Sequence, residues 1–295
     1  MSMTVLALVQ AAMADLWAEI PTSIVSATNV TQIQLRNLLY SEARHLRNRR
    51  CFPSQKRVHT FDTSSGVSSY QLPKDFYAAI LDTQYNNDER QRLIGPLSDG
   101  EFAYLTKGIG SSTQNFSFRI FGPDNNPNSA GGQFHIDPTG PSSAVELSFE
   151  YITSSMFKPK NWLPSTAYTS GVYVNANGNN YLCDTNGTSH ASTAPTGTTQ
   201  DITDGTTRWD YVSDAYENIV LDTDLCLFDD DIVIAGLKWR YLRAQRRDYE
   251  RELLEYKALL EKAETRFNGP FRGSFTRLSG APTTWYENGY VGWRF

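Results

Sequence analysis

Side chains that could carry out catalysis are few in this sequence, and their spacing matches no catalytic pattern. The four histidines and three cysteines are His45, His59, His135 and His190, with Cys51, Cys183 and Cys226. They form no CxxC pair, no His-paired metal pattern and no recognisable nucleophile–base motif. The chain also lacks GxSxG, HExxH, GxxxxGK[ST] and GxGxxG motifs. We therefore predict no enzyme activity, no catalytic residues and no cofactor.

Carboxylates offer two further candidates for chemistry. Glu146 and Glu150 are four residues apart on a predicted strand, which separates them by about 13 Å, beyond the spacing of a glycosidase pair. Five acids precede the last predicted helix: Asp222, Asp224, Asp229, Asp230 and Asp231. A metal site is one interpretation, but the EF-hand spacing and its glycine are missing. Acids in a first turn also satisfy free backbone N–H groups, so we expect a helix start and no metal.

The basic residues indicate little affinity for nucleic acid. The net charge of -5 and the pI near 5.4 are atypical of a dedicated nucleic-acid binder. They suit a protein past which DNA slides without sequence-specific binding. A basic cluster runs from Arg44 to Arg57 and lacks interleaved aromatics for base stacking. It is either a solvated helix end or a surface that faces an acidic protein partner.

Hydrophobic periodicity predicts a mixed α+β chain. Helices are expected over residues 4–19, 29–50 and 97–108, and short alternating strands between 56 and 151. The opening residues lack the positive charge of a signal peptide, and no run reaches the length of a membrane span. We therefore expect a soluble chain made in a cytoplasm with reduced thiols.

Residues 161–213 differ in composition from the rest of the chain. They are rich in Gly, Thr, Asn and Ser, contain one Arg, and show repeated short strands without a helical period. This change predicts an inserted all-β module between two parts of one adaptor core, residues 1–160 and 214–267. The fold class is then a helical bundle with a small antiparallel β part, the module, and an extended C-terminal arm.

The last predicted helix spans residues 232–267 and carries an apolar stripe that only Arg246 interrupts. The stripe includes Ile232, Trp239, Leu242, Tyr249, Leu253, Tyr256 and Leu260. A continuous helix of this length would extend roughly 50 to 55 Å. The 3,4 spacing fits two arrangements, a helical hairpin partner inside one subunit or a helix that packs against other subunits in a ring.

Residues 268–295 combine aromatics with glycines and prolines and have no period. The aromatics are Phe271, Phe275, Trp285, Tyr286, Tyr290, Trp293 and Phe295. Disordered tails are usually poor in aromatics, whereas aromatic anchors are typical of arms that dock into a partner. The segment either docks into another protein or wraps its own subunit.

The order of these elements resembles a known family. The sequences YQLPKDF (70–76) and GLKWRYLRA (236–244), the SDGEF helix and the strand ending VELSFEYI are similar to head-to-tail adaptors of short-tailed bacteriophages, also called connector or tail tubular protein A-like proteins. The resemblance covers most of residues 1–160 and 214–267. It implies a ring subunit, usually one of twelve copies, located in the virion neck. Its implied partners are the portal protein, the tail nozzle protein, further copies of itself and passing double-stranded DNA, with no membrane. The family also implies that the C-terminal arm reaches the portal.

The module resembles the small carbohydrate-binding domains of chitinases. In such domains exposed aromatics stack on sugar rings, and the candidates here are Trp162, Tyr168, Tyr181 and Trp209. The alternative, which we favour, is that these rings form the core of a module with little else to bury. The sequence thus predicts a structural adaptor whose module decorates the exterior. The other hypothesis is a glycan- or receptor-binding tail protein that acts through the module.

Overall fold

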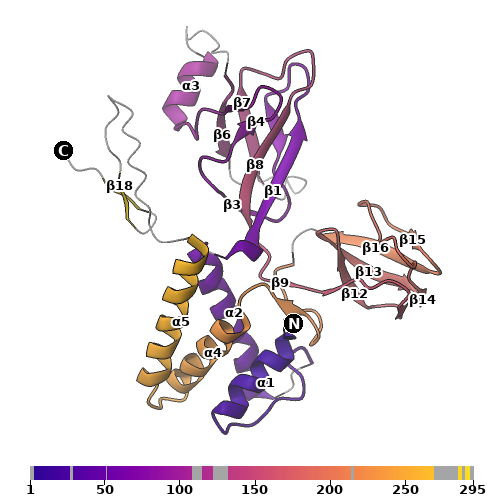
Figure 1. Ribbon diagram of the computed structural model, residues 1–295, viewed down its shortest axis with the longest axis vertical. Helices are drawn as coiled ribbons and strands as arrows, with labels where there is room; N and C mark the ends of the chain where they lie inside the picture. Colours follow the sequence, from indigo (N-terminus) through magenta and orange to yellow (C-terminus); the bar gives the residue numbers. More distant parts are fainter. Residues whose placement is uncertain are drawn as a thin grey trace.

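The computed structural model describes residues 3–26, 29–50, 52–107, 115–121, 132–213, 216–268, 285–287 and 290–292. Figure 1 shows three parts around a common centre: a helical bundle, a β lobe that carries one helix, and a β module that projects to the side. The predicted α+β class is confirmed, since helices and several antiparallel sheets are both present.

The bundle contains α1 (Val5–Asp15), α2 (Val30–Arg49), α4 (Asp230–Ala244) and α5 (Glu250–Asn268). Each of the first three begins at a polar cap: Thr4, Asn29 and Asp229 accept hydrogen bonds from the backbone N–H groups of Ala7, Thr31 and Asp231. Their apolar faces meet in one core that draws on all four helices. Capping and amphipathic spacing together explain why these segments are helical.

The prediction of one continuous helix over 232–267 is wrong. The chain turns between α4 and α5, where Arg246 adopts a left-handed conformation (φ 56°) and the Asp248 carboxylate caps the N–H of Glu250. The turn coincides with the interruption of the apolar stripe at Arg246. The two halves then pack against each other, with Trp239 in ring contact with Tyr249 and Tyr256.

The β lobe contains two sheets. The first has the order β1 (Lys56–Asp62), β8 (Glu146–Thr153), β4 (Tyr85–Asn86), β5 (Gln91–Arg92), with β3 (Phe76–Ala79) also paired to β8. The second joins β2 (Ser69–Gln71), β7 (Gln133–Asp137) and β6 (Ser117–Phe121), and α3 (Asp99–Lys107) lies beside it. Phe118, Phe134 and Phe149 stack between the sheets, at centroid distances of 5.1 and 5.2 Å.

The module begins with β10 (Lys160–Asn161), which pairs in parallel with β12 (Tyr173–Ala176). The main sheet continues through β13 (Asn179–Thr185), β16 (Thr207–Ser213) and β15 (Ile202–Asp204), and β11 (Ala167–Tyr168) pairs with β14 (Gly187–Thr188). On either side of the module, β9 (Phe157–Lys158) pairs with β17 (Leu225–Cys226). This pairing holds the two connections to the module together at the bundle.

Near the C-terminus, β18 (Trp285–Glu287) and β19 (Tyr290–Gly292) form an antiparallel hairpin. Within the described ranges, no helix combines the length and the apolar character needed to cross a membrane.

Candidate interaction surfaces

Several of the cysteines and histidines considered above for catalysis are buried or make structural hydrogen bonds. Cys183 and Cys226 are buried, and burial raises the pKa of the Cys226 thiol to about 12. The exposed His190 accepts hydrogen bonds at Nδ1 from the backbone N–H groups of Ser192 and Thr193. Cys51 lies outside the described residues. In the part of the chain that the structure describes, no group of three or more His, Cys, Asp or Glu residues is placed to bind a metal ion.

The acids before α4 organise the backbone around them. Asp222 accepts hydrogen bonds from the N–H groups of Ile24 and Val25 at 2.8 and 3.1 Å. Asp224 is almost fully buried and accepts from the Tyr216 hydroxyl at 2.9 Å. Because burial and the nearby Asp224 disfavour the phenolate, the pKa of Tyr216 is raised. These carboxylates therefore fix the return of the chain from the module to the bundle.

A buried carboxylate joins α2, α4 and α5. Glu42 is fully buried and accepts hydrogen bonds from Arg240 Nε and from the Tyr256 hydroxyl, each at 2.5 Å. Gly236 faces it, and a Cβ at that position would lie 2.4 Å from Cδ of Glu42. The absence of a side chain at Gly236 therefore allows α2 to approach α4. No sequence pattern predicts this cluster, and its one local sign is an acid on the inward face of α2.

The same cluster predicts a pH dependence of stability. Burial raises the pKa of Glu42 from its ordinary 4.5, although Tyr256 and Arg240 oppose the shift. A raised folded-state pKa means that the carboxyl's contribution is fully present below about pH 4.5 and is lost as the pH rises through the folded-state pKa. Glu42→Gln is the reference, because its amide does not titrate. Between about pH 4 and pH 7, we expect the free energy of unfolding of the natural protein to fall relative to that of Glu42→Gln. Urea unfolding at both pH values measures this change.

Glu101 provides a control, because its carboxyl changes the stability in the opposite direction as the pH changes. Its pKa is lowered by hydrogen bonds from the side chain and backbone of Ser98, so its contribution is lost as the pH falls. A stability difference between the natural protein and Glu42→Gln that is independent of pH would contradict the assignment to Glu42.

The apolar stripe of the last helices is largely covered within one chain. Ile232, Trp239, Leu242, Tyr256 and Leu260 are buried, while Tyr249 and Leu253 are partly buried. Of the two arrangements left open by the sequence, the hairpin inside one subunit matches this packing. Within one chain, the buried stripe residues belong to the core of the helical bundle.

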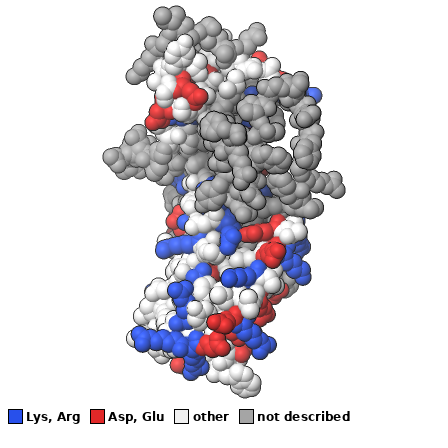
Figure 2. Space-filling model, turned by 90° about the vertical axis from the view of Figure 1, so that its left-hand side faces the viewer, with Lys and Arg blue, Asp and Glu red and all other residues white. Residues whose placement is uncertain are grey.

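The outer face of α5 remains available. Figure 2 shows acidic and basic side chains mixed over the helical part of this face. Its exposed residues include Arg251, Leu254, Glu255, Lys257 and Glu261, and Leu254 is 66% exposed. A mixed-charge face with an isolated leucine is typical of the solvent-facing side of an amphipathic helix.

The basic cluster at the end of α2 connects the bundle to the β lobe. The guanidinium of Arg47 lies 4.3 Å from the ring centroid of Tyr77, and its Nη1 donates to the carbonyl of Ser154 at 3.2 Å. Arg49 pairs with Glu264 at 3.2 Å. Arg44 and Arg50 are exposed. Most of the cluster is thus engaged within the chain, which favours the helix-end interpretation.

The aromatics proposed for sugar stacking lie in or against the module core. Tyr181 and Trp209 are fully buried, so neither ring face is available to a sugar. Trp162 and Tyr168 are partly buried and pack against the same cluster. The indole N–H groups of Trp162 and Trp209 both donate to Asp204 Oδ2, at 2.7 and 2.8 Å. This packing corresponds to the core role that we favoured.

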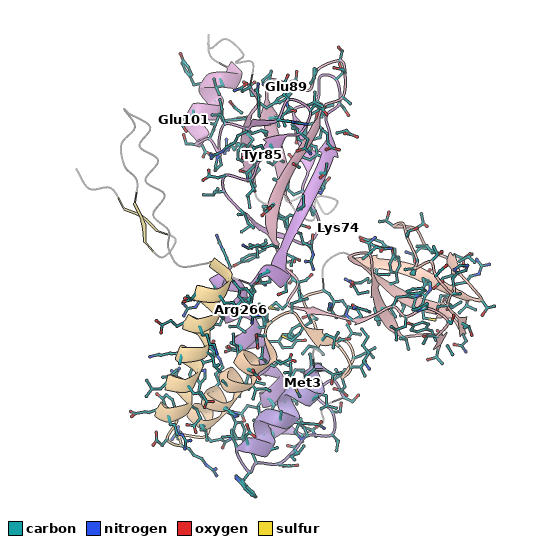
Figure 3. The ribbon with its side chains drawn as sticks, in the orientation of Figure 1. Met3, Lys74, Tyr85, Glu89, Glu101 and Arg266 are labelled. Atoms are coloured by element: carbon teal, nitrogen blue, oxygen red, sulfur yellow. The ribbon has the colours of Figure 1, made fainter. Side chains whose placement is uncertain are left out.

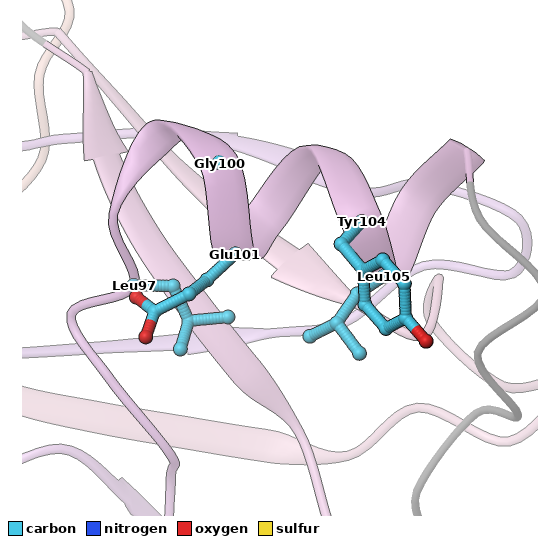
Figure 4. A pocket seen from close by; sticks show the side chains of 5 residues that line it. All are labelled: Leu97, Gly100, Glu101, Tyr104 and Leu105. Carbon is cyan, nitrogen blue, oxygen red and sulfur yellow. The ribbon is translucent and has the colours of Figure 1, made fainter.

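A shallow apolar pocket lies against α3, shown in Figure 4. It has a volume of about 430 Å³ and is lined by Leu97, Gly100, Glu101, Tyr104 and Leu105. Tyr104 is 67% exposed. In Figure 3 the labelled Glu101 lies in the β lobe, whereas Met3 and Arg266 lie on the bundle. The pocket therefore belongs to the end of the molecule away from the bundle.

The predicted docking arm can be located only in part. Trp285, Tyr286 and Tyr290 belong to the β18–β19 hairpin. Phe271, Phe275, Trp293 and Phe295 lie outside the described residues, so the docking role stays a prediction.

Comparison with known proteins identifies a family whose sequence model matches this chain. A sequence model of the family described as SU10 adaptor protein matches residues 3–182. The match covers α1, α2, the β lobe and the first strands of the module. A search of curated proteins found no match.

Proposed function

This chain belongs to the SU10 adaptor protein family, and from that premise we propose that it is a head-to-tail adaptor subunit that joins the portal to the tail nozzle. It is a structural adaptor component of a bacteriophage virion. Its proposed place is the neck between capsid and tail, after synthesis in the host cytoplasm. The family match over more than half of the chain carries this proposal.

The proposed assembly is a closed ring of copies, of the twelvefold kind that the resemblance implies, around a DNA channel. Two observations support it. The exposed face of α5 carries charges of both signs, with which complementary charges of a neighbouring subunit can pair. The net charge of -5, with Arg49 and Arg240 already in ion pairs, suits a channel that does not retain passing DNA.

The C-terminal arm is the proposed contact with the portal. Replacing all seven of its aromatics by serine at constant chain length is expected to weaken attachment to isolated portal rings by at least about tenfold, because aromatic anchors contribute most of such binding energy. Sedimentation of portal rings with the purified chain measures attachment. Leu163→Ser, which changes an exposed apolar residue of the module, is the matched control. Undiminished attachment of the serine variant would remove the arm's role.

Imaging of mature particles tests the proposal as a whole. We expect density for this chain in a collar between capsid and tail, and tail-less heads when its gene is inactivated. Density at the distal tip of the tail, or normal tails without the gene product, would contradict the adaptor role.

A further inference from the structure

The β lobe and the helical bundle have separate apolar cores. Among the described residues, the lobe cluster around Phe118, Phe134 and Phe149 shares no member with the cluster of the four bundle helices. The chain passes between the two parts twice, at residues 52–56 and 153–157, and Figure 1 shows both crossings near the end of α2. Parts that share no core and are joined by two short segments are typical of bodies that move relative to each other.

Hydrogen bonds locate a pivot in the first crossing at Gln55. The hydroxyl of Ser54 donates to the carbonyl of Leu227, which precedes α4 on the bundle side. Lys56, two residues later, already pairs with Ile152 in the lobe sheet. Gln55 is the one residue between these two attachments, and it ends the 3₁₀ turn η1 (Pro53–Gln55).

The pivot of the second crossing is Ser155. Just before it, the N–H of Ser154 donates to the carbonyl of Asp75 within the lobe at 2.6 Å. The N–H of Ser155 donates to the hydroxyl of Thr153 in the lobe at 3.1 Å. Its own hydroxyl accepts from the N–H of Tyr216, a residue of the bundle core, at 2.8 Å. Ser155 is therefore the last residue held by the lobe and the first held by the bundle.

Buried polar atoms without partners lie at both pivots. Gln55 is fully buried, yet neither its Nε2 nor its Oε1 has a hydrogen-bond partner in the described part of the chain. The same is true of Oγ of Ser154 and of Nε of Arg47, which contacts Ser154 through Nη1. Such atoms are few in folded proteins, and each disfavours the arrangement that buries it. The angle between lobe and bundle therefore carries a free-energy penalty at its pivots.

Tyr77 on β3 opposes this penalty. Its ring centroid lies 4.3 Å from the guanidinium carbon of Arg47, and its hydroxyl donates to Oδ1 of Asn48 at 2.8 Å, both in the last turn of α2. A cation–π contact and one hydrogen bond are each of modest strength, and Tyr77 is 37% exposed, so water can replace them. The lobe touches the module through a longer contact, with Lys74 Nζ 5.9 Å from the ring centroid of Tyr211.

We infer that the β lobe pivots on the bundle at Gln55 and Ser155, and that Tyr77 is the latch that holds the angle described here. When the latch opens, Tyr77 leaves Arg47 and Asn48, and the buried polar atoms at the pivots reach solvent. Because a modest contact opposes a modest penalty, the two angles differ little in free energy and both are populated. The inference goes beyond the proposed function and does not depend on it, since it concerns a single subunit.

Distances between two spin labels in the full-length chain test the pivot. Cysteines replace Thr60 of the lobe and Glu261 of α5, both exposed. Cys51→Ser prevents a third label, while Cys183 and Cys226 are buried. Pulsed electron double resonance measures the distribution of label distances. We expect two distances in the protein with its natural latch, the second of them in the minority, and a single distance would contradict the pivot.

Variants at the latch and at a pivot give the direction of the effect. Tyr77→Ala is expected to raise the ratio of the second distance to the first at least about tenfold, because it removes both contacts with α2. Tyr85→Ala, which removes a 43% exposed tyrosine of the same lobe, is the matched control and should leave the ratio unchanged. Gln55→Leu replaces the unpartnered amide by an apolar side chain and should lower the ratio at least threefold.

Three outcomes would overturn the inference. The first is a distance distribution of Tyr77→Ala that matches that of the natural protein or of Tyr85→Ala. The second is a ratio in Gln55→Leu at or above the natural one, which would refute the penalty at the pivot. The third is loss of hydrogen-exchange protection in β8 of Tyr77→Ala, which would show that Tyr77 stabilises the lobe itself and does not act as a latch.

Discussion

Replacement of Glu42 by alanine is expected to lower the free energy of unfolding by about 3 kcal/mol at neutral pH. The substitution leaves the Arg240 guanidinium, whose side chain is 16% exposed, without its carboxylate. It also leaves the Tyr256 hydroxyl without its acceptor and creates a cavity between three helices. Urea unfolding monitored by circular dichroism measures the change. A matched control is Glu264→Ala, which removes an ion pair with 44% and 38% exposed side chains and is expected to cost less than about 0.5 kcal/mol.

A second prediction concerns Gly236, which faces Glu42 from α4. Gly236→Ala places a Cβ about where the Glu42 side chain lies, and we expect a cost of about 3 kcal/mol from the clash. In the double variant Glu42→Ala/Gly236→Ala, the alanine at position 236 occupies the space that the Glu42 side chain fills in the natural protein. The loss of unfolding free energy in the double variant should therefore be at least about 1 kcal/mol smaller than the sum of the losses in the two single variants. Strict additivity would show that the two positions do not interact.

Replacement of Asp204 by alanine is expected to unfold the module while the bundle stays folded. Asp204 is 3% exposed, and its carboxylate accepts from the indoles of Trp162 and Trp209 and from the N–H of His190. Its loss leaves these donors unsatisfied around the module core, at about 1 to 3 kcal/mol each. A module this small has little other stability to draw on. Hydrogen exchange of residues 160–213, compared with residues 230–268, measures the outcome.

Two variants sharpen this test. Asp204→Asn keeps one acceptor oxygen but turns an amide N–H₂ toward a donor, so its effect should be intermediate. Arg208→Ala removes an ion pair with Asp201 in which the side chains are 44% and 67% exposed, and should cost less than about 0.5 kcal/mol. Protected amides throughout the module in Asp204→Ala would contradict the role of this carboxylate. Simultaneous loss of protection in α4 and α5 would contradict the independence of the module.

The sequence by itself determined the features that depend on neighbouring residues in the chain. Helix starts at Thr4, Asn29 and Asp229 follow from caps, and strands such as Lys56–Asp62 follow from alternation. The module was visible as a change in composition, and its first strand begins one residue before the predicted boundary. Such signals are local, so they require no knowledge of the packing around them.

Only the tertiary structure decided which surfaces are occupied. Glu42 and Arg240 are 198 residues apart in the chain, and nothing in the local pattern of either marks their contact. The reversal at Arg246 replaced one long helix by a hairpin, in which the two halves of the stripe pack against each other through Trp239, Tyr249 and Tyr256. The rings of Tyr181 and Trp209 turned inward, while Trp17 stayed in solvent. Periodicity identifies an apolar face, but the element that covers it is chosen by contacts between distant segments.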